Sequence, residues 1–389
     1  MRSFVVPLVL PLVLAACGAA SSPASRAEPP VSFPLAPALG AACEGARLLA
    51  VPLDRAARGP WAVGARTVRV DDLTAEVWYP ARPGSDAGQP LVRYDLRTVM
   101  PAAEAAKIPD ADNAWLTCAC GRDLPVDDAH GPYPVVLFLH GAASFRAQSA
   151  SLMAHWASRG FVVIAPDLPG AGLADVLGGG GGSPLGAPGL IMDVIARARG
   201  PEEGDPLAFV RARMDAARVG VAGHSLGSIL GATITDHPEI GVRISMAGMA
   251  QPEAGVSTLL LAGDHDQIAS ADAARAGIAE APGPARLVVV RGAGHLAFSD
   301  LCTLGADRGG ALAIAAAHGI VVPAMIATLA QDGCRPTDAP VASTAPAIRA
   351  ATAGVLEERL RCDPGAATAL TALPATFDVE VVERRGAVP

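Results

Sequence analysis

The chain has 389 residues, which is long for an average domain but ordinary for one α/β domain that carries insertions. Hydrophobic residues make up 51% of it, beside 42 Gly and 34 Pro, so the composition predicts a packed core with many turns and excludes a wholly disordered chain. The formal net charge of −8 argues against nucleic acid or an anionic membrane surface as the main partner, because both select a basic face.

The N-terminus has the character of an export signal. Residues 1–16 form a short apolar segment behind Arg2, shorter than the roughly 20 residues that a membrane-spanning helix needs. The end of this segment, Leu-Ala-Ala-Cys17, resembles the lipobox of bacterial lipoproteins. The resemblance implies that Cys17 is lipidated and anchors the protein to the cell envelope, with a secreted or periplasmic protein as the alternative. Residues 17–45, rich in Ser, Pro and Ala, predict a flexible tether.

Six cysteines remain once Cys17 is assigned to lipid, and an even number in an exported chain predicts disulfides. The pairing is open, although we expect Cys302 to pair with Cys334 because both flank the region after the last predicted strand. Zinc is the weaker alternative, since Cys118 and Cys120 lack C-x-x-C spacing and no H-E-x-x-H pattern occurs.

Residues 46–389 are expected to form a single domain. Thr67–Tyr79 alternates partly between apolar and polar residues, which is typical of antiparallel edge strands. Residues 80–134 are rich in Pro, Asp and Gly and predict an insertion or a long loop, with a helix near residues 101–107. Continuous apolar runs then predict strands that are buried on both faces. These runs are Val135–Leu139, Phe161–Ala165, Val219–Ala222, Val242–Met246, Thr258–Ala262 and Arg286–Val290.

Helical stretches separate several of these strands, for example Gln148–Ser158 and Leu226–Thr235. The alternation of strand and helix predicts an α/β fold with a mostly parallel central sheet flanked by helices. Ala-rich helices are expected over residues 311–330 and 345–361. The glycine run at residues 178–182 predicts a surface insertion, with a mobile lid as the alternative.

A glycine-flanked serine follows the strand at Val219–Ala222. The sequence Gly223-His-Ser225-Leu-Gly227 fits the nucleophile elbow G-x-S-x-G, in which small neighbours allow a sharp turn that exposes the serine side chain. A purely structural turn that happens to hold a serine is the alternative. Lys107 is the only lysine and has no serine three residues before it, so a Ser-x-x-Lys acylase motif is excluded.

A serine hydroxyl is a weak nucleophile and needs a base that a carboxylate orients. His295 follows the last predicted strand in a glycine-rich loop, which can deliver an imidazole to the carboxyl edge of the sheet. Asp264 and Asp266 compete for the role of the acid after the preceding strand, and the pattern Gly-x-x-Asp favours Asp266. We interpret His224 and His318 as structural. A metal site in the Asp-His-Asp cluster is a weaker alternative.

Hydrolysis through a serine also needs N–H donors for the developing oxyanion. Leu226 offers one donor as the residue after the nucleophile. A second is expected from the loop after Val135–Leu139, where His140-Gly-Ala142-Ala matches the short His-Gly motif of hydrolases. Ala142 is our choice for this donor.

From about residue 66 onward the chain resembles secreted bacterial α/β-hydrolases related to dienelactone hydrolase and platelet-activating-factor acetylhydrolase, with cutinase-like polyesterases as cousins. The resemblance rests on the elbow and on residues 131–141, 156–167 and 292–302. It implies hydrolysis of carboxylic esters by an acyl-enzyme route, without a metal or organic cofactor. The mammalian acetylhydrolase carries its acid after an earlier strand, and the matching end here, residues 246–249, has no carboxylate, which favours Asp266.

The sequence therefore predicts a serine esterase with Ser225, His295 and Asp266 as its triad, in the order of the α/β-hydrolases. Short or medium acyl esters are expected, since nothing in the sequence marks a long lipid tunnel. The alternatives are a polyesterase or phospholipid acyl hydrolase, an acyltransferase, and a non-catalytic binding protein of the same fold. The expected partners are a small-molecule or lipid-like ester and a membrane, which the protein reaches through Cys17, and not nucleic acid. The number of subunits is left open.

Overall fold

The computed structural model describes residues 43, 45–178, 182–197, 204–248, 255–281 and 283–384. The predicted signal segment at 1–16, Cys17 and nearly all of the predicted tether lie outside the described residues, as does part of the glycine run. Among the described residues, none of the helices has the length and apolar character that crossing a bilayer requires. The lipid anchor and the division into tether and domain therefore stay predictions.

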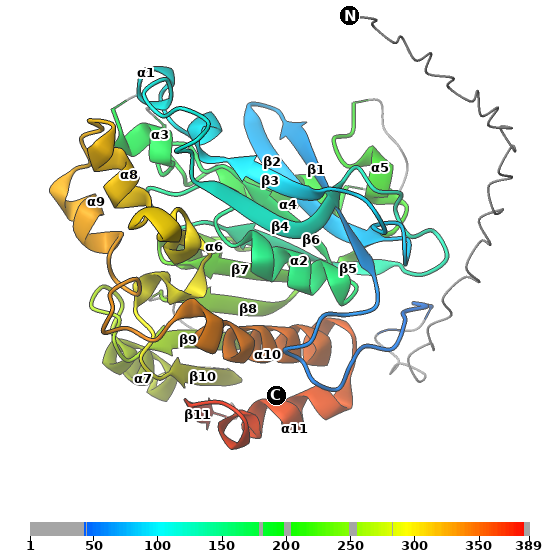
Figure 1. Cartoon of the computed structure of the whole chain (residues 1–389). Coiled ribbons are helices and arrows are strands. Elements are labelled where there is room, and N and C mark those ends of the chain that lie inside the picture. The colour runs from blue at the N-terminus through cyan, green and yellow to red at the C-terminus, as the bar shows by residue number, and fades with distance from the viewer. Residues whose placement is uncertain are drawn as a thin grey trace, which may run out of the picture. The chain divides into compact units, whose positions relative to one another are not determined.

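Eleven strands of the described residues form one sheet in the order β11-β10-β9-β8-β7-β5-β6-β2-β1-β4-β3 (Figure 1). Their bounds are β1 Ala62–Val70, β2 Leu73–Ala81, β3 Leu91–Asp95, β4 Trp115–Arg122, β5 Tyr133–Leu139, β6 Val162–Pro166, β7 Met214–His224, β8 Ile240–Met246, β9 Ser257–Gly263, β10 Ala285–Val290 and β11 Val379–Arg384. The central strands from β6 to β10 pair in parallel. Strands β2 and β11 join them antiparallel. The predicted mostly parallel sheet is confirmed.

The central strands are buried on both faces, as their continuous apolar runs predicted. In β5, Val136 and Phe138 belong to the core cluster that includes α2 and α10, whereas Leu137 and Leu139 belong to the cluster that includes α4. Alternate side chains of a strand point to opposite faces of the sheet, so each of these strands needs helices on both sides.

Helices cover both faces of the sheet. Their bounds are α1 Ala102–Ala105, α2 Ala150–Ser158, α3 Leu173–Val176, α4 Ala187–Ala196, α5 Ala208–Arg211, α6 Leu226–Ala232, α7 Ala271–Ala279, α8 Ala311–Ala317, α9 Ala324–Leu329, α10 Val341–Leu360 and α11 Pro364–Thr371. Short 3₁₀ helices are η2 Leu96–Val99, η3 His295–Phe298, η4 Leu301–Thr303, η5 Ala306–Arg308 and η6 Leu373–Ala375. Helices α2 and α10 pack on one face, and α4 and α7 pack on the other (Figure 1).

The region at 80–134 is more regular than a long loop. It contributes β3 and β4, which extend the sheet beyond β1, so the hairpin of β1 and β2 lies inside the sheet and not at its edge as predicted. In β4 the alternate residues Leu116, Cys118 and Cys120 are buried, while Thr117 and Ala119 between them are exposed. A strand with one solvent-exposed face has only an alternating apolar pattern, which is difficult to recognise in a region rich in Pro, Asp and Gly. The helix expected near 101–107 is present as α1.

Two other elements differ from the prediction. The helix expected over 311–330 is divided into α8 and α9, because Gly319 adopts φ +64° and Pro323 starts a new helix as its N-cap. Strand β11 was not predicted and pairs antiparallel with β10. It is only six residues long and continues an edge, so its position depends on β10 and not on a pattern of its own.

Three disulfides join the six cysteines of the described residues. The expected pair Cys302–Cys334 is confirmed, and the other pairs are Cys43–Cys362 and Cys118–Cys120. The pair Cys43–Cys362 links residues 319 positions apart and fastens the N-terminal segment to the end of α10.

Replacing Cys43 and Cys362 together by Ala should lower the free energy of unfolding by about 2–4 kcal/mol, because a bridge between distant residues restricts the unfolded chain strongly. Urea denaturation of the oxidised protein measures the change. The double replacement of Cys118 and Cys120 by Ala is the control, since a bridge across a separation of 2 restricts little chain. Equal losses in the two variants would contradict this explanation.

Candidate active site

Ser225 lies at the sharp turn between β7 and α6, with φ 53° and ψ −121°. L-residues rarely adopt such a backbone, so the surrounding packing must hold it. A Cβ at Gly223 would lie 2.3 Å from the carbonyl carbon of Gly227, and a Cβ at Gly227 would lie 2.1 Å from the carbonyl oxygen of Leu139. Both positions therefore require glycine. The Ser225 N–H donates to the Met246 carbonyl at 2.9 Å, which ties the turn to the end of β8.

Three side chains that the sequence singled out lie in one hydrogen-bonded chain. His295 Nε2 is 2.9 Å from Ser225 Oγ, and His295 Nδ1 is 3.0 Å from Asp266 Oδ2. The imidazole is 0% exposed and Asp266 is 5% exposed. The parallel strands β7, β9 and β10 end at the same edge of the sheet, which is why residues so distant in the chain meet here. The arrangement can pass a proton from the hydroxyl to an oriented imidazole.

The carboxylate of Asp266 is held by backbone donors as well as by the imidazole. Its Oδ1 accepts from the N–H groups of Ile268 at 2.8 Å and Ala269 at 2.7 Å. These bonds fix the orientation of the carboxylate. A carboxylate in this setting can hold one tautomer of His295 and stabilise the imidazolium that proton transfer creates.

The competing carboxylate, Asp264, does not face the imidazole. It accepts from the Gly292 N–H at 2.6 Å and pairs with Arg291 at 3.3 Å near the surface. His265 turns toward Asp338, 3.3 Å away. The Asp-His-Asp cluster thus sends its three side chains to three different partners. Within the described ranges, no group of three or more His, Cys, Asp or Glu converges as a set of metal ligands.

The loop after β5 is fixed beside the serine by a buried histidine. His140 Nε2 accepts from the Leu168 N–H at 2.9 Å, so its Nδ1 carries the hydrogen and donates to the Gly141 carbonyl at 2.8 Å. Burial lowers the pKa of His140, which keeps the ring neutral. A Cβ at Gly141 would lie 3.3 Å from Ser225 Cβ, so the loop packs directly on the elbow.

The two backbone donors expected for an oxyanion follow these fixed residues. Leu226 is the first residue of α6, whose leading N–H groups have no partner within the helix. Ala142 directly follows Gly141, whose N–H donates to Gln148 Oε1 at 2.9 Å. Gln148 is fully buried and orients the loop, and no motif in the sequence pointed to it.

His224, interpreted as a packing residue, lies against His295. Its Nε2–H donates to the backbone carbonyl of His295 at 3.0 Å, and the two rings are 5.1 Å apart. Burial first, and then the neighbouring His295, lower the pKa of His224 to about 3. The ring is therefore neutral and supports the loop of His295. His318 contacts Asp112 at 3.1 Å and joins α8 to the region of α1.

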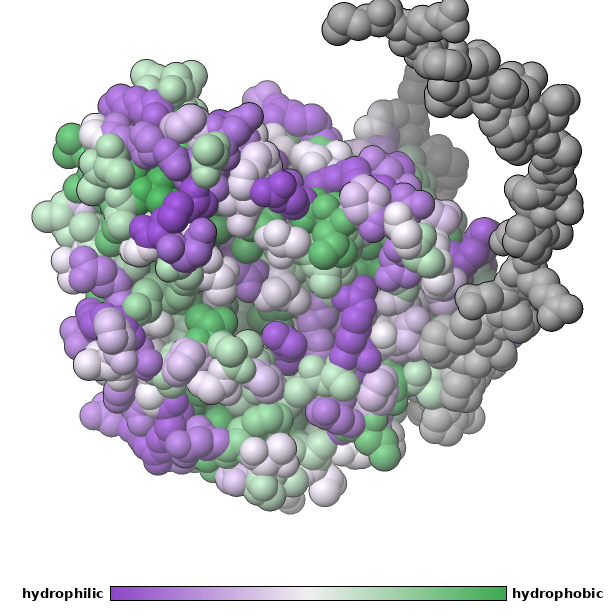
Figure 2. Space-filling view, viewed as in Figure 1, coloured by the Kyte–Doolittle hydropathy of each residue, from purple (hydrophilic) through white to green (hydrophobic). Residues whose placement is uncertain are grey.

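An apolar cavity of about 560 Å³ lies beside Ala142, which is within the usual size of a small-molecule site. Its walls come from the loop after β5, the segment after His295, and helices α3, α8 and α9, which lie on the same side of the molecule as α1 in Figure 1. Lining side chains include Phe145, Leu177, Leu296, Leu304, Ala315 and Ile326. Figure 2 shows hydrophobic surface near α8 and α9, interrupted by hydrophilic residues. Val321 and Met325, 85% and 77% exposed, belong to this part of the chain.

Comparison with known proteins agrees with this architecture. A family model described as Chlorophyllase matches residues 124–179. The ferulic acid esterase from Streptomyces cinnamoneus has a similar structure, with a TM-score of 0.55, 20% sequence identity, and coverage of 86% of this chain and 98% of that chain. No curated protein matches the chain. The closer resemblance to dienelactone hydrolase and the acetylhydrolase stays a prediction, and the chain has the α/β-hydrolase fold.

Proposed function

We propose that this protein hydrolyses carboxylic esters, with Ser225 as nucleophile, His295 as general base and Asp266 as the orienting acid. The observation that carries the proposal is the hydrogen-bonded chain of these three side chains, with 2.9 Å between Ser225 Oγ and His295 Nε2, on a strained turn. A serine in a loose surface turn would have neither the base nor the strain. The similar fold of a protein that is itself an esterase agrees with this function.

In the proposed reaction, Ser225 Oγ attacks the ester carbonyl carbon while its proton moves to His295 Nε2. The negative charge on the carbonyl oxygen is stabilised by the N–H groups of Leu226 and Ala142. When the tetrahedral intermediate collapses, His295 gives the proton to the leaving alkoxide. Water then attacks the acyl-serine through the same base, and the acid is released. Asp266 holds the imidazole in place throughout.

We propose that the apolar cavity receives a short or medium acyl group of the substrate. Ala142, the residue that would hold the carbonyl oxygen, lines it, and most of its other lining residues are apolar. Burial of each CH₂ contributes about 0.8 kcal/mol, so kcat/KM should rise about fourfold for each added CH₂ until the cavity is filled.

The three disulfides support a location outside a reducing cytosol. We propose that the protein is exported and, following the sequence of residues 14–17, held at the cell envelope by lipid on Cys17.

Replacing Ser225 by Ala should lower ester turnover by about 10⁴-fold or more, because the nucleophile is lost and only binding and the oxyanion donors remain. The measurement uses residues 18–389 with intact disulfides and a p-nitrophenyl ester series from acetate to palmitate. Folding is checked by circular dichroism. An inert wild-type protein, or equal turnover by the variant, would contradict the proposal, and turnover that depends on an added alcohol would favour an acyltransferase.

Replacing Asp266 by Asn should lower kcat by about 10³- to 10⁴-fold, because the amide cannot hold the required tautomer of His295. The matched control is Asp264→Asn, which should stay within about threefold of wild type since Asp264 faces Arg291 near the surface. The rates are compared on one p-nitrophenyl ester. A large loss in the Asp264 variant with near-normal activity in the Asp266 variant would reverse the assignment.

A phenyl group in the cavity should change the preference for acyl length. Ala315 lines the cavity, so Ala315→Phe should lower kcat/KM for the octanoate ester by about tenfold and leave the acetate ester within about twofold, because only the longer chain needs the filled space. Ala316, exposed on the same helix, gives the control Ala316→Phe. Equal losses on both esters would show that the cavity does not receive the acyl group.

A further inference from the structure

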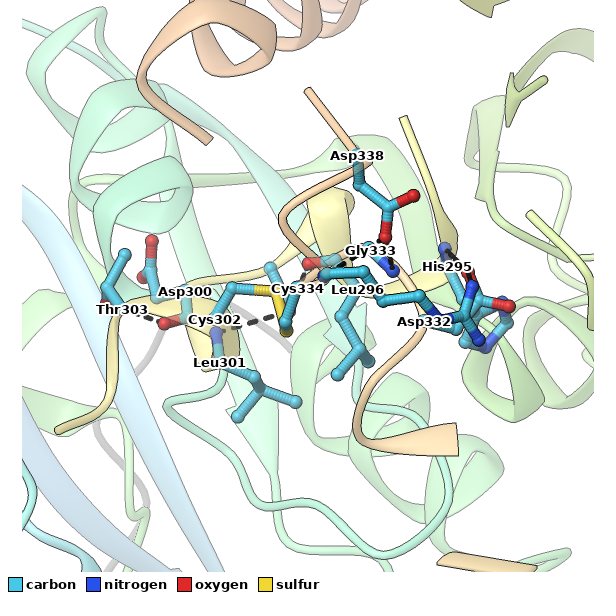
Figure 3. Close-up of a disulfide and its surroundings, with 12 residues drawn as sticks. His295, Leu296, Asp300, Leu301, Cys302, Thr303, Asp332, Gly333, Cys334 and Asp338 are labelled. Atoms are coloured by element: carbon cyan, nitrogen blue, oxygen red, sulfur yellow. Dashed lines mark hydrogen bonds and ion pairs between the residues drawn. A yellow bond between two sulfur atoms is a disulfide. The ribbon is translucent and has the colours of Figure 1, made fainter. Parts of the chain in front are cut away.

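A second buried carboxylate lies between the loops that carry Asp266 and His295. Asp332, in the segment between α9 and α10, is 1% exposed. Its Oδ1 accepts from the backbone N–H of His295 at 2.9 Å, and its Oδ2 accepts from the backbone N–H of Gln267 at 3.0 Å. Gln267 directly follows Asp266. Figure 3 shows Asp332 beside His295. The Asp332 side chain thus accepts hydrogen bonds from the backbone of both His295 and the residue after Asp266.

Close packing of glycines makes these contacts possible. A Cβ at Gly294 would lie 2.5 Å from Asp332 Oδ1 and 2.3 Å from the backbone nitrogen of Gly333. Gly333 has φ +94°, and a Cβ there would lie 2.9 Å from the backbone nitrogen of Leu296. The Leu296 N–H also donates to the backbone carbonyl of Asp332 at 2.8 Å. The glycine before His295 therefore serves contact with Asp332 and not only the sharpness of a turn.

The segment that carries Asp332 is itself fastened on two sides. The disulfide Cys302–Cys334 joins it to the chain that follows His295, and Asp338 Oδ2 accepts from the N–H groups of Gly333 at 3.0 Å and Arg335 at 3.1 Å. Figure 3 shows the disulfide next to Leu296, with Asp332 and His295 together beyond it. Because its segment is held in place, the Asp332 carboxylate can fix the positions of the backbone groups that it binds. A carboxylate on an unrestrained loop would instead move with those groups.

We propose that Asp332 is a positioning residue for the proposed esterase reaction, which fixes the loops of His295 and Asp266 relative to each other. The inference rests on the function proposed above. Asp332 touches no reacting atom in this account and acts through the backbone of the two loops. It does not line the cavity, although its neighbours Gln331 and Arg335 do, so substrate binding should not depend on it directly.

The replacement Asp332→Asn tests this role at nearly constant volume. An amide has one oxygen, so its nitrogen would face one of the two backbone N–H donors and leave that donor unsatisfied. One of the two loops must then shift. A misplacement of about 1 Å can lower turnover about a hundredfold, so we expect kcat to fall about tenfold to a hundredfold with KM within about twofold of wild type.

The matched control is Asp300→Asn. Asp300 is another buried carboxylate near the same disulfide, but its side chain accepts from Ser151 at the start of α2, not from the loops of His295 and Asp266. Kinetics use a p-nitrophenyl ester, with the active fraction counted by a fluorophosphonate and the fold checked by thermal unfolding. The control should keep kcat within about twofold. Equal losses of kcat in both variants, or a normal kcat in a folded Asp332→Asn protein, would overturn the proposal.

Two further measurements separate this proposal from the esterase function. If the wild type shows no turnover, the proposed function fails, and hydrogen exchange decides the role of Asp332: the amides of His295 and Gln267 should exchange faster in Asp332→Asn, and unchanged exchange would overturn it. If Asp332→Asn does not fold, Gly294→Ala tests the same contact, because its methyl group would collide with both the Asp332 carboxylate and the Gly333 backbone and push this segment away from His295. A wild-type kcat in that variant would also overturn the proposal.

Discussion

The backbone strain at Ser225 is the constraint on which the rest of the site depends. A non-glycine residue at φ 53° and ψ −121° costs about 1–3 kcal/mol and persists only where neighbours determine it. Here Gly223 and Gly227 approach so closely that neither tolerates a side chain, and β5 closes the turn from the other side. The buried sheet thus supplies the free energy that keeps the serine at the end of β7, where a base on a neighbouring loop can reach its hydroxyl.

The parallel order of the sheet explains how distant residues meet at this turn. Strands β7, β9 and β10 end at one edge and deliver Ser225, Asp266 and His295 from separate loops. The sheet sets the positions of the strand ends and leaves the conformations of the loops free. Buried polar groups outside the three side chains limit that freedom: His140 and Gln148 act on the loop of Ala142, and in our proposal Asp332 acts on the loops of the acid and the base. The segments that carry the cavity wall also carry these supports, so the proposed function links substrate binding to the geometry of the reaction.

The sequence predicted what local chemistry determines. Continuous apolar runs predicted β5 to β10, because strands that are buried on both faces consist almost wholly of apolar residues. The glycine pattern around Ser225 predicted the turn, because only glycine neighbours allow its backbone conformation. Elements that depend on contacts between residues distant in the chain could not be predicted from such local patterns. Strands β4 and β11 can be recognised only once their partner strands are known. In the sequence alone, nothing distinguishes Asp332 from other loop aspartates, because its contacts with Gly294 and His295 exist only in the fold. The cavity has no signature either, since its apolar residues come from several separate segments.

Covalent labelling tests the central claim, that Ser225 is an activated nucleophile, most directly. The folded protein is treated with a fluorophosphonate, residual ester turnover is followed, and the modified peptide is identified by mass spectrometry. We expect one phosphonyl group per chain, located on Ser225, with turnover lost in proportion to labelling. Labelling confined to other residues, or turnover that survives complete modification of Ser225, would contradict it.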